Sequence, residues 1–226
     1  DRPVIVIPSY NGARKLPVLT PLLALLLARE GVAVVVHGSS TEDKRVPAQA
    51  VLAELGITGD TDPHGTVRVQ AGQVRFVPTA ALNTGLDRLL SVRRVVGLRN
   101  SGHSLVKLMN PCDAPALVVG SYTHPEYLQS MSAAFALTGQ HALLLRGTEG
   151  EPVADVRRTP AMDVFRDGQT RRVQEQREGS LDKLPDMPAI DPAATAAYIQ
   201  QVLRGERAAP EPIALQVHHI LQEVKR

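Results

Sequence analysis

Short runs of aliphatic residues alternate with segments of helical periodicity along most of the chain, and this alternation restricts the fold more than any other feature. The runs expected to form strands are Val4–Ile7, Val32–Val36, Val74–Val77, Ala116–Val119 and Ala142–Leu145. Apolar strands separated by helices are typical of a mainly parallel central sheet with helices on both faces. The sequence therefore predicts an α/β fold.

The expected helices begin and end at residues that suit helix termini. Thr20 should cap a helix whose first residue is Pro21, because a missing N–H does no harm there, and Gly31 should end it. Acidic Glu126 should lie in the first turn of a later helix, where it favours the helix dipole. The other helices are expected at residues 46–55, 85–95, 100 or 101 to 107, 127–137, 192–203 and 212–224, and two further strands at 162–165 and 171–174.

Length and composition exclude several classes of protein. The 226 residues contain no internal repeat and fit a single α/β domain over residues 1–226. A single cysteine, Cys112, excludes a disulfide scaffold. The longest fully apolar stretch, Leu22–Ala28, is far shorter than the roughly 20 residues of a membrane span. No leader opens the chain, so we expect a cytoplasmic protein with no membrane partner; starting within the first strand, it resembles an excerpt of a longer protein.

Basic residues are concentrated in one segment, although the formal net charge is only +2. Between Leu86 and Lys107, five residues are Lys or Arg and only Asp87 is acidic. A local concentration of this kind is typical of an anion-binding face, and a solvated helix surface is the alternative. The small total charge is less than a dedicated nucleic-acid protein usually carries.

The same segment resembles a known family. Residues 97–111, Gly-Leu-Arg-Asn-Ser-Gly-His-Ser-Leu-Val-Lys-Leu-Met-Asn-Pro, resemble without a gap the G-[VI]-R-T-x-F-N-L-L-G-P-L-x-N-P segment of anthranilate phosphoribosyltransferases. Val92-Arg93-Arg94 resembles the family's V-R-R, and His37-Gly38 resembles its H-G pair. The resemblance runs from the first strand to about Gly150. It implies the nucleoside phosphorylase/phosphoribosyltransferase catalytic domain of glycosyltransferase family 3, without that family's small N-terminal helical domain.

The phosphate and metal motifs of that family are altered at three places. Its pyrophosphate-binding G-T-G-G-D-G loop is replaced by Ile7–Gly12, although glycines are what let backbone N–H groups approach a phosphate closely. Its N-R-x-x-S-S segment becomes Ser39–Lys44, which brings two carboxylates, and its metal-holding G-L-D-E is shortened to Thr148–Glu151. Because donors for the transition state are altered together, we expect that phosphoribosyl transfer is lost.

Basic residues are gained where the family has Asn and Gly-Pro. His103 and Lys107 are four residues apart, so on a helix they share one face, and Arg99 precedes that helix. Residues that follow the first and second strands should lie at the same rim, because ligand sites of α/β sheets form beyond the carboxyl ends of the strands. The predicted nucleic-acid-binding residues are Arg14, Lys15, Lys44, Arg45, Arg93, Arg94, Arg99, His103 and Lys107.

This pattern resembles the YbiB-type branch of the family, and the resemblance implies a nucleic-acid-binding homodimer. We expect phosphate contacts with DNA or RNA in a basic groove, little sequence preference, strong salt dependence, no catalytic residue and no cofactor. Tyr10 is the one aromatic residue placed to stack on a base. His37, at a strand end, is expected to be a hydrogen-bonded structural residue.

The alternative is an active phosphoribosyltransferase. It would need Glu149 and Glu151 to bind Mg²⁺, Asn11 and Gly12 to hold phosphoribosyl pyrophosphate, and Arg93 to hold an anionic acceptor. A third hypothesis is a scaffold whose groove binds an acidic protein partner.

Overall fold

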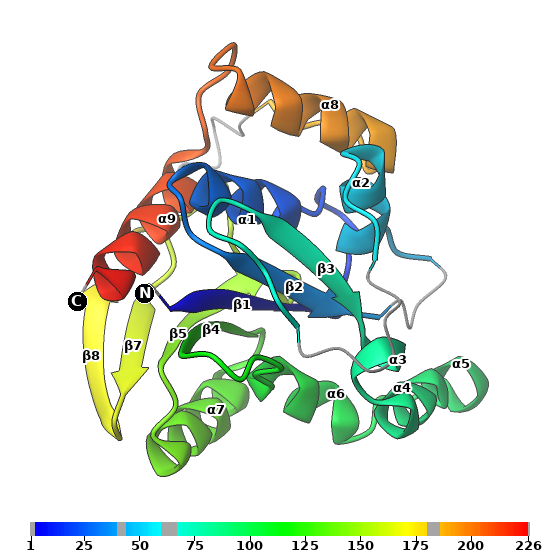
Figure 1. The fold of residues 1–226 in the computed structure, drawn as a ribbon, viewed down its shortest axis with the longest axis vertical. Helices are drawn as coiled ribbons and strands as arrows, with labels where there is room; N and C mark the ends of the chain where they lie inside the picture. The colour runs from blue at the N-terminus through cyan, green and yellow to red at the C-terminus, as the bar shows by residue number, and fades with distance from the viewer. Residues whose placement is uncertain (1–2, 40–43, 60–66, 180–185, 226) are drawn as a thin grey trace.

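The computed structural model describes residues 3–39, 44–59, 67–179 and 186–225, and its strands form one mixed sheet (Figure 1). The sheet has eight strands in the order β3-β2-β1-β4-β5-β7-β8, with β6 paired to β5. The parallel strands are β1 (Val4–Ser9), β2 (Val34–Gly38), β3 (Val74–Pro78), β4 (Ala116–Tyr122) and β5 (Ala142–Thr148). The antiparallel additions are β6 (Glu151–Ala154), β7 (Met162–Arg166) and β8 (Gln169–Gln174). The predicted α/β fold with a mainly parallel sheet is confirmed.

Helices cover both faces of the sheet. One face packs against α1, α2, α8 and α9, and the other against α7 (Figure 1). Their bounds are α1 (Thr20–Arg29), α2 (Ala48–Glu54), α7 (Pro125–Thr138), α8 (Pro192–Leu203) and α9 (Glu211–Val224). None of the helices in the described part of the chain is long and apolar enough to cross a membrane.

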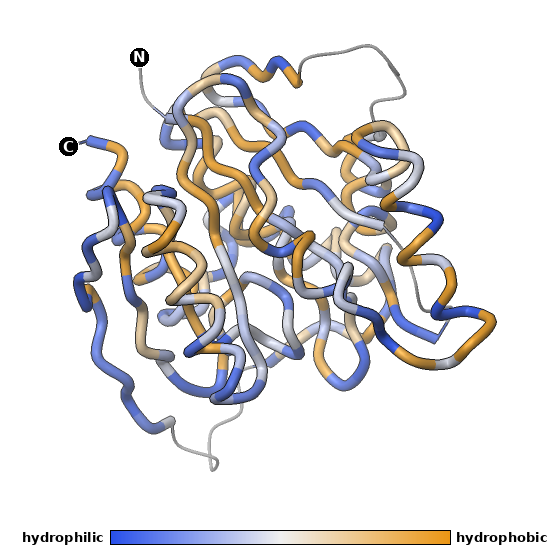
Figure 2. The backbone as a smooth tube through the Cα atoms, turned by 90° about the horizontal axis from the view of Figure 1, so that it is seen from below, coloured by the Kyte–Doolittle hydropathy of each residue, from blue (hydrophilic) through white to orange (hydrophobic). Residues whose placement is uncertain are grey.

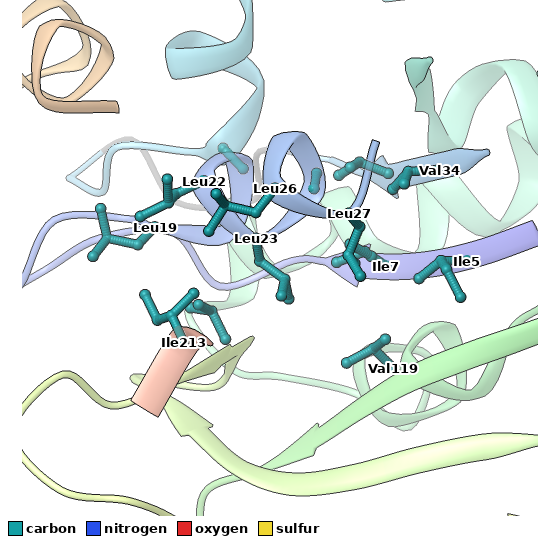
Figure 3. Close-up of a cluster of buried hydrophobic side chains, with 14 of the residues drawn as sticks. Ile5, Ile7, Leu19, Leu22, Leu23, Leu26, Leu27, Val34, Val119 and Ile213 are labelled. Carbon is teal, nitrogen blue, oxygen red and sulfur yellow. The ribbon is translucent and has the colours of Figure 1, made fainter. Parts of the chain in front are cut away.

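The core divides between the two faces because successive side chains of a strand point to opposite sides. Ile5 and Ile7 of β1 belong to the larger cluster with α1, whereas Val6 belongs to the smaller cluster with Phe135 of α7. Figure 3 shows Leu27 of α1 close to Ile7 within the larger cluster. Hydrophobic residues accordingly gather along the central strands (Figure 2).

A group of short helices lies beyond the carboxyl ends of β2 and β3 (Figure 1). They are α3 (Thr79–Leu82), α4 (Thr84–Ser91), α5 (Arg93–Val96), α6 (Gly102–Leu105) and the 3-10 helix η1 (Val106–Leu108). The single helix predicted over 85–95 is therefore wrong in detail, because a break at Val92 separates α4 from α5. The α-helix predicted through Lys107 is also wrong, since it narrows to a 3-10 turn after Leu105.

Several predicted boundaries move by one or two residues. Thr20 is the first residue of α1 rather than its cap, and its hydroxyl donates to Glu151 instead of accepting from a helix N–H. The helix predicted from Val46 begins at Ala48, because Val46 forms a β-bridge with Ala13. The strand predicted from Val32 begins at Val34. The helix predicted from residue 127 begins at Pro125, a residue suited to the first helical position.

Candidate functional site

The loop that follows β1 is held by a buried carboxylate from the start of β6. Glu151 is only 2% exposed. One of its oxygens accepts the backbone N–H groups of Asn11 (2.7 Å) and Gly12 (2.9 Å). The other oxygen accepts the hydroxyls of Thr20 (2.8 Å) and Ser9 (2.5 Å). A charged acceptor with four donors forms strong hydrogen bonds in a site with little water.

A second carboxylate, that of Glu149, holds the next part of the loop. It accepts the backbone N–H groups of Arg14 (2.8 Å), Lys15 (3.0 Å) and Leu16 (3.3 Å). Glu149 and Gly150 form the two-residue turn between β5 and β6, with φ of 54° and 88°. A glutamate with positive φ is strained, because such turns favour Asn, Asp or Gly. The three hydrogen bonds compensate for that strain.

The N–H groups that an incoming phosphate would need are therefore bonded to carboxylates of the same chain. Asn11 and Gly12, the alternative pyrophosphate-binding residues, already donate to Glu151. Glu149 and Glu151, the alternative Mg²⁺ ligands, have their oxygens engaged by the loop. No group of three potential metal ligands occurs within the described residues.

Lys107 lies inside the protein, so the predicted open groove is wrong for this residue. Lys107 is 8% exposed, and its ammonium donates to the carbonyl of Gly150 at 2.9 Å, as the Ser121 hydroxyl does at 2.8 Å. Burial lowers the Lys107 pKa to about 8, with Arg99 and Arg45 adding to the effect and Glu151 opposing it. The sequence argument assumed an α-helix through Lys107, whereas Val106–Leu108 form a 3-10 turn in which the Lys107 side chain is buried.

His103 is buried as well, but it shares a cavity with Arg99 and Lys107. The three residues therefore come together as predicted, around a pocket of about 280 Å³ rather than along an open groove. Arg99 is exposed at the pocket and is the member of this group that solvent reaches.

The other predicted basic residues lie at the surface beyond the strands. A β-bridge joins Ala13 to Val46, so Arg14 and Lys15 lie near Lys44 and Arg45. The side chains of Arg14, Lys15 and Lys44 are exposed. Arg45 is half-buried and donates to the carbonyl of Asn11 at 3.3 Å. Glu42 and Asp43, the two carboxylates of the Ser39–Lys44 segment, lie outside the described residues.

Arg93 and Arg94 lie farther along, on α5, where Arg94 is exposed and Arg93 is half-buried. Sequence reasoning missed the aliphatic residues that surround them. The exposed aliphatic residues of the α4–α6 segment are Leu89, Val92, Val95, Val96, Leu98 and Leu105. A concentration of exposed apolar side chains in one segment is typical of an interaction face.

Tyr10 is not available for base stacking, so that prediction is wrong. It is 5% exposed, and its ring packs with Leu90 and Val106. Its hydroxyl accepts from Thr79 (3.1 Å) and is bonded to His37 Nδ1 (2.8 Å). His37 Nε2 lies 3.2 Å from the Met109 carbonyl, which only accepts, so this nitrogen carries the proton and Nδ1 accepts from Tyr10.

His37 is thus the structural residue that the sequence predicted. Complete burial lowers its pKa to about 4, so the ring is neutral near pH 7.

Comparisons with known proteins agree with this architecture, although no protein-family profile matches the chain. The chain is 39% identical over 218 residues to the uncharacterized protein YbiB of Escherichia coli (strain K12), covering 94% of the chain and 67% of YbiB. It is 31% identical over 147 residues to the anthranilate phosphoribosyltransferase of Symbiobacterium thermophilum, covering 64% of the chain and 43% of that enzyme.

The crystal structure of anthranilate phosphoribosyltransferase from Thermus thermophilus has the same fold, with a TM-score of 0.67 at 25% identity. The match covers 96% of the chain and 66% of that enzyme, so the chain spans about two thirds or less of the length of these relatives. By its sequence and its fold, the chain belongs to the anthranilate phosphoribosyltransferase family, in the branch that contains YbiB.

Proposed function

We propose that this domain binds DNA or RNA through phosphate contacts, with little sequence preference, and does not transfer phosphoribosyl groups. The observation that carries the proposal is the loop after β1. Its backbone donors are bonded to Glu149 and Glu151, while the side chains of Arg14 and Lys15 on the same loop are exposed.

The bonded loop argues against a small diphosphate ligand. Phosphoribosyl pyrophosphate would meet two carboxylates where it needs donors, and would have to displace Glu151 from four hydrogen bonds in a buried site. Each hydrogen bond to a charged group contributes about 1.5–3 kcal/mol, so this displacement costs several kcal/mol. Catalysis by preorganised donors requires that those donors be free to meet the reacting group.

The exposed cations around the loop suit a long polyanion. Arg14 and Lys15 on one loop, Lys44 on a second and Arg99 on a third extend from the carboxyl edge of the sheet, so successive phosphates of a strand would find separate partners. Phosphate contacts carry no sequence information, which accounts for weak specificity. With no Trp, three Phe and four Tyr in the chain, and with Tyr10 buried, stacking contributes less than the phosphate contacts do.

A homodimer of the full-length protein is part of the proposal. The apolar surface of the α4–α6 segment lies next to Arg93 and Arg94, and a second subunit there would bring two basic edges together.

Two titrations on one sample test the proposal. Fluorescence anisotropy with labelled DNA and RNA of mixed sequence should show binding of similar strength across sequences. Calorimetry with phosphoribosyl pyrophosphate and Mg²⁺ should show no binding. Tight binding of the diphosphate without binding of nucleic acid would instead establish the transferase alternative. Competition between DNA and an acidic protein partner for the domain distinguishes the scaffold hypothesis from the proposed function.

A further inference from the structure

The cavity of about 280 Å³ lies at the carboxyl end of β4, between two helical walls. One wall comes from α6 and η1, and the other from α7, which Figure 1 shows on the same face of the sheet. The backbone N–H groups held by Glu149 and Glu151 belong to a different part of the edge, the loop after β1. The cavity is therefore distinct from that loop, and Arg99 is the residue that belongs both to its lining and to the proposed phosphate contacts.

The first wall is lined by basic residues. Arg99, His103 and Lys107 line it, and no carboxylate is among the cavity's lining residues in the described part of the chain. The Lys107 ammonium has a neutral carbonyl as its hydrogen-bond partner; the Glu151 carboxylate attracts it, whereas Arg99 and Arg45 repel it. A buried cation in such surroundings is stabilised by an anion, so the cavity should select a negatively charged ligand.

The opposite wall is largely aromatic and apolar. Tyr127 and Met131 are four residues apart on α7 and therefore lie on one face of it. Tyr127 is half-exposed, and its ring is tilted against His124 rather than stacked on it. Ser121 and Thr123 add polar residues to the lining, and the Ser121 hydroxyl donates to the carbonyl of Gly150. A ligand that fits has an anionic group at one end, polar atoms in the middle and a flat ring at the other.

Size restricts that ligand further. Small-molecule sites commonly measure about 300–1,000 Å³, so this cavity is at the lower limit and suits one nucleotide rather than several. We propose that the pocket binds a single nucleoside monophosphate unit, with its phosphate toward Arg99 and Lys107 and its base against Tyr127. As a subsite for one nucleotide of a bound strand the pocket rests on the proposed function, whereas a free nucleotide would use the same chemistry.

Calorimetry with adenosine 5′-monophosphate, adenosine and inorganic phosphate tests the pocket directly. The monophosphate should bind at least tenfold more tightly than either fragment. Tyr127→Ala should weaken binding of the monophosphate by about tenfold, because it removes one stacking contact, and should leave binding of inorganic phosphate unchanged. Arg99→Gln should weaken the binding of both the monophosphate and inorganic phosphate. Leu137→Ala, an exposed position on the same helix outside the cavity, is the matched control and should change neither.

Labelled single-stranded DNA then separates the two sources of the ligand. Competition between the monophosphate and the DNA would identify a nucleotide of the strand as the occupant, and simultaneous binding would identify a free nucleotide; either result supports the pocket. No binding of the monophosphate at millimolar concentration, or binding that neither variant weakens, overturns the inference. If that same sample still binds DNA, the proposed function stands although the pocket inference fails. If the sample binds the monophosphate but not DNA, only the proposed function fails.

Discussion

Removal of the Glu151 carboxylate should destabilise the domain strongly, because four donors depend on it. Glu151→Ala leaves two backbone N–H groups and two hydroxyls without their acceptor inside the protein. Each buried donor left unpaired costs about 1–3 kcal/mol, so even the lower limit gives about 4 kcal/mol. That is a large share of a total stability of roughly 5–15 kcal/mol.

Glu151→Gln tests the contribution of the negative charge separately from that of the hydrogen-bond acceptor. Its amide oxygen still accepts the N–H groups of Asn11 and Gly12, and its amide nitrogen donates to the two hydroxyl oxygens, which rotate to accept. Only the charge-assisted part of the bonds is lost, which is about half of their strength, so we expect about half of the loss caused by Glu151→Ala, or about 2 kcal/mol at the same lower limit.

Urea denaturation followed by circular dichroism measures both losses, provided that the m-value stays constant. Glu206→Gln is the control, because Glu206 pairs with Arg204 at the surface and its replacement should leave the urea midpoint unchanged. If Glu151→Ala stays within about 1 kcal/mol of the original chain, the carboxylate does not hold the loop and the reasoning is refuted.

Three further predictions address the same edge of the sheet. Glu149→Gly should leave the melting temperature within a few degrees, because relief of roughly 1 kcal/mol of left-handed strain offsets three hydrogen bonds that water replaces; a large drop in differential scanning fluorimetry would contradict this. Burial lowers the pKa of His37 to about 4, whereas in the unfolded chain it is about 6.5. Below about pH 6.5 the unfolded chain therefore binds the proton first, and stability decreases as the pH decreases. Between pH 7 and pH 5 that loss is about 2 kcal/mol in urea titrations, and His37→Gln should lack it; an identical pH dependence in both proteins would refute the assignment. Arg14→Gln combined with Lys15→Gln should reduce the slope of log K against log salt for duplex DNA by about 1.8, whereas Arg29→Gln, at the far end of α1, should not change it.

Much of the fold could be predicted because local patterns specify it. The aliphatic runs placed the five parallel strands, and Gly31, Gly56 and Gly97 marked the ends of helices or turns where the structure has a positive φ. The break at Val92 and the 3-10 turn at Lys107 were missed, because neither has a proline or glycine to mark it.

The site was harder to predict because it depends on contacts that are distant in sequence. Glu151 bonds Asn11 and Gly12 across about 140 positions, and no local pattern relates the two segments. A usable signal was Gly150 between two glutamates, which marks a tight turn that presents both carboxylates to one loop. Tyr10 was misassigned for the same reason, because its burial depends on Leu90, a residue far along the chain.

The salt dependence of nucleic-acid binding tests the central claim most directly. Anisotropy titrations of duplex DNA at several salt concentrations should give a straight line of log K against log salt, with a slope near −0.9 for each phosphate contacted. Four exposed cations at this edge predict a slope of about −3 to −4. A slope near zero, or no binding at low salt, would contradict a phosphate-binding surface at the carboxyl edge of this sheet.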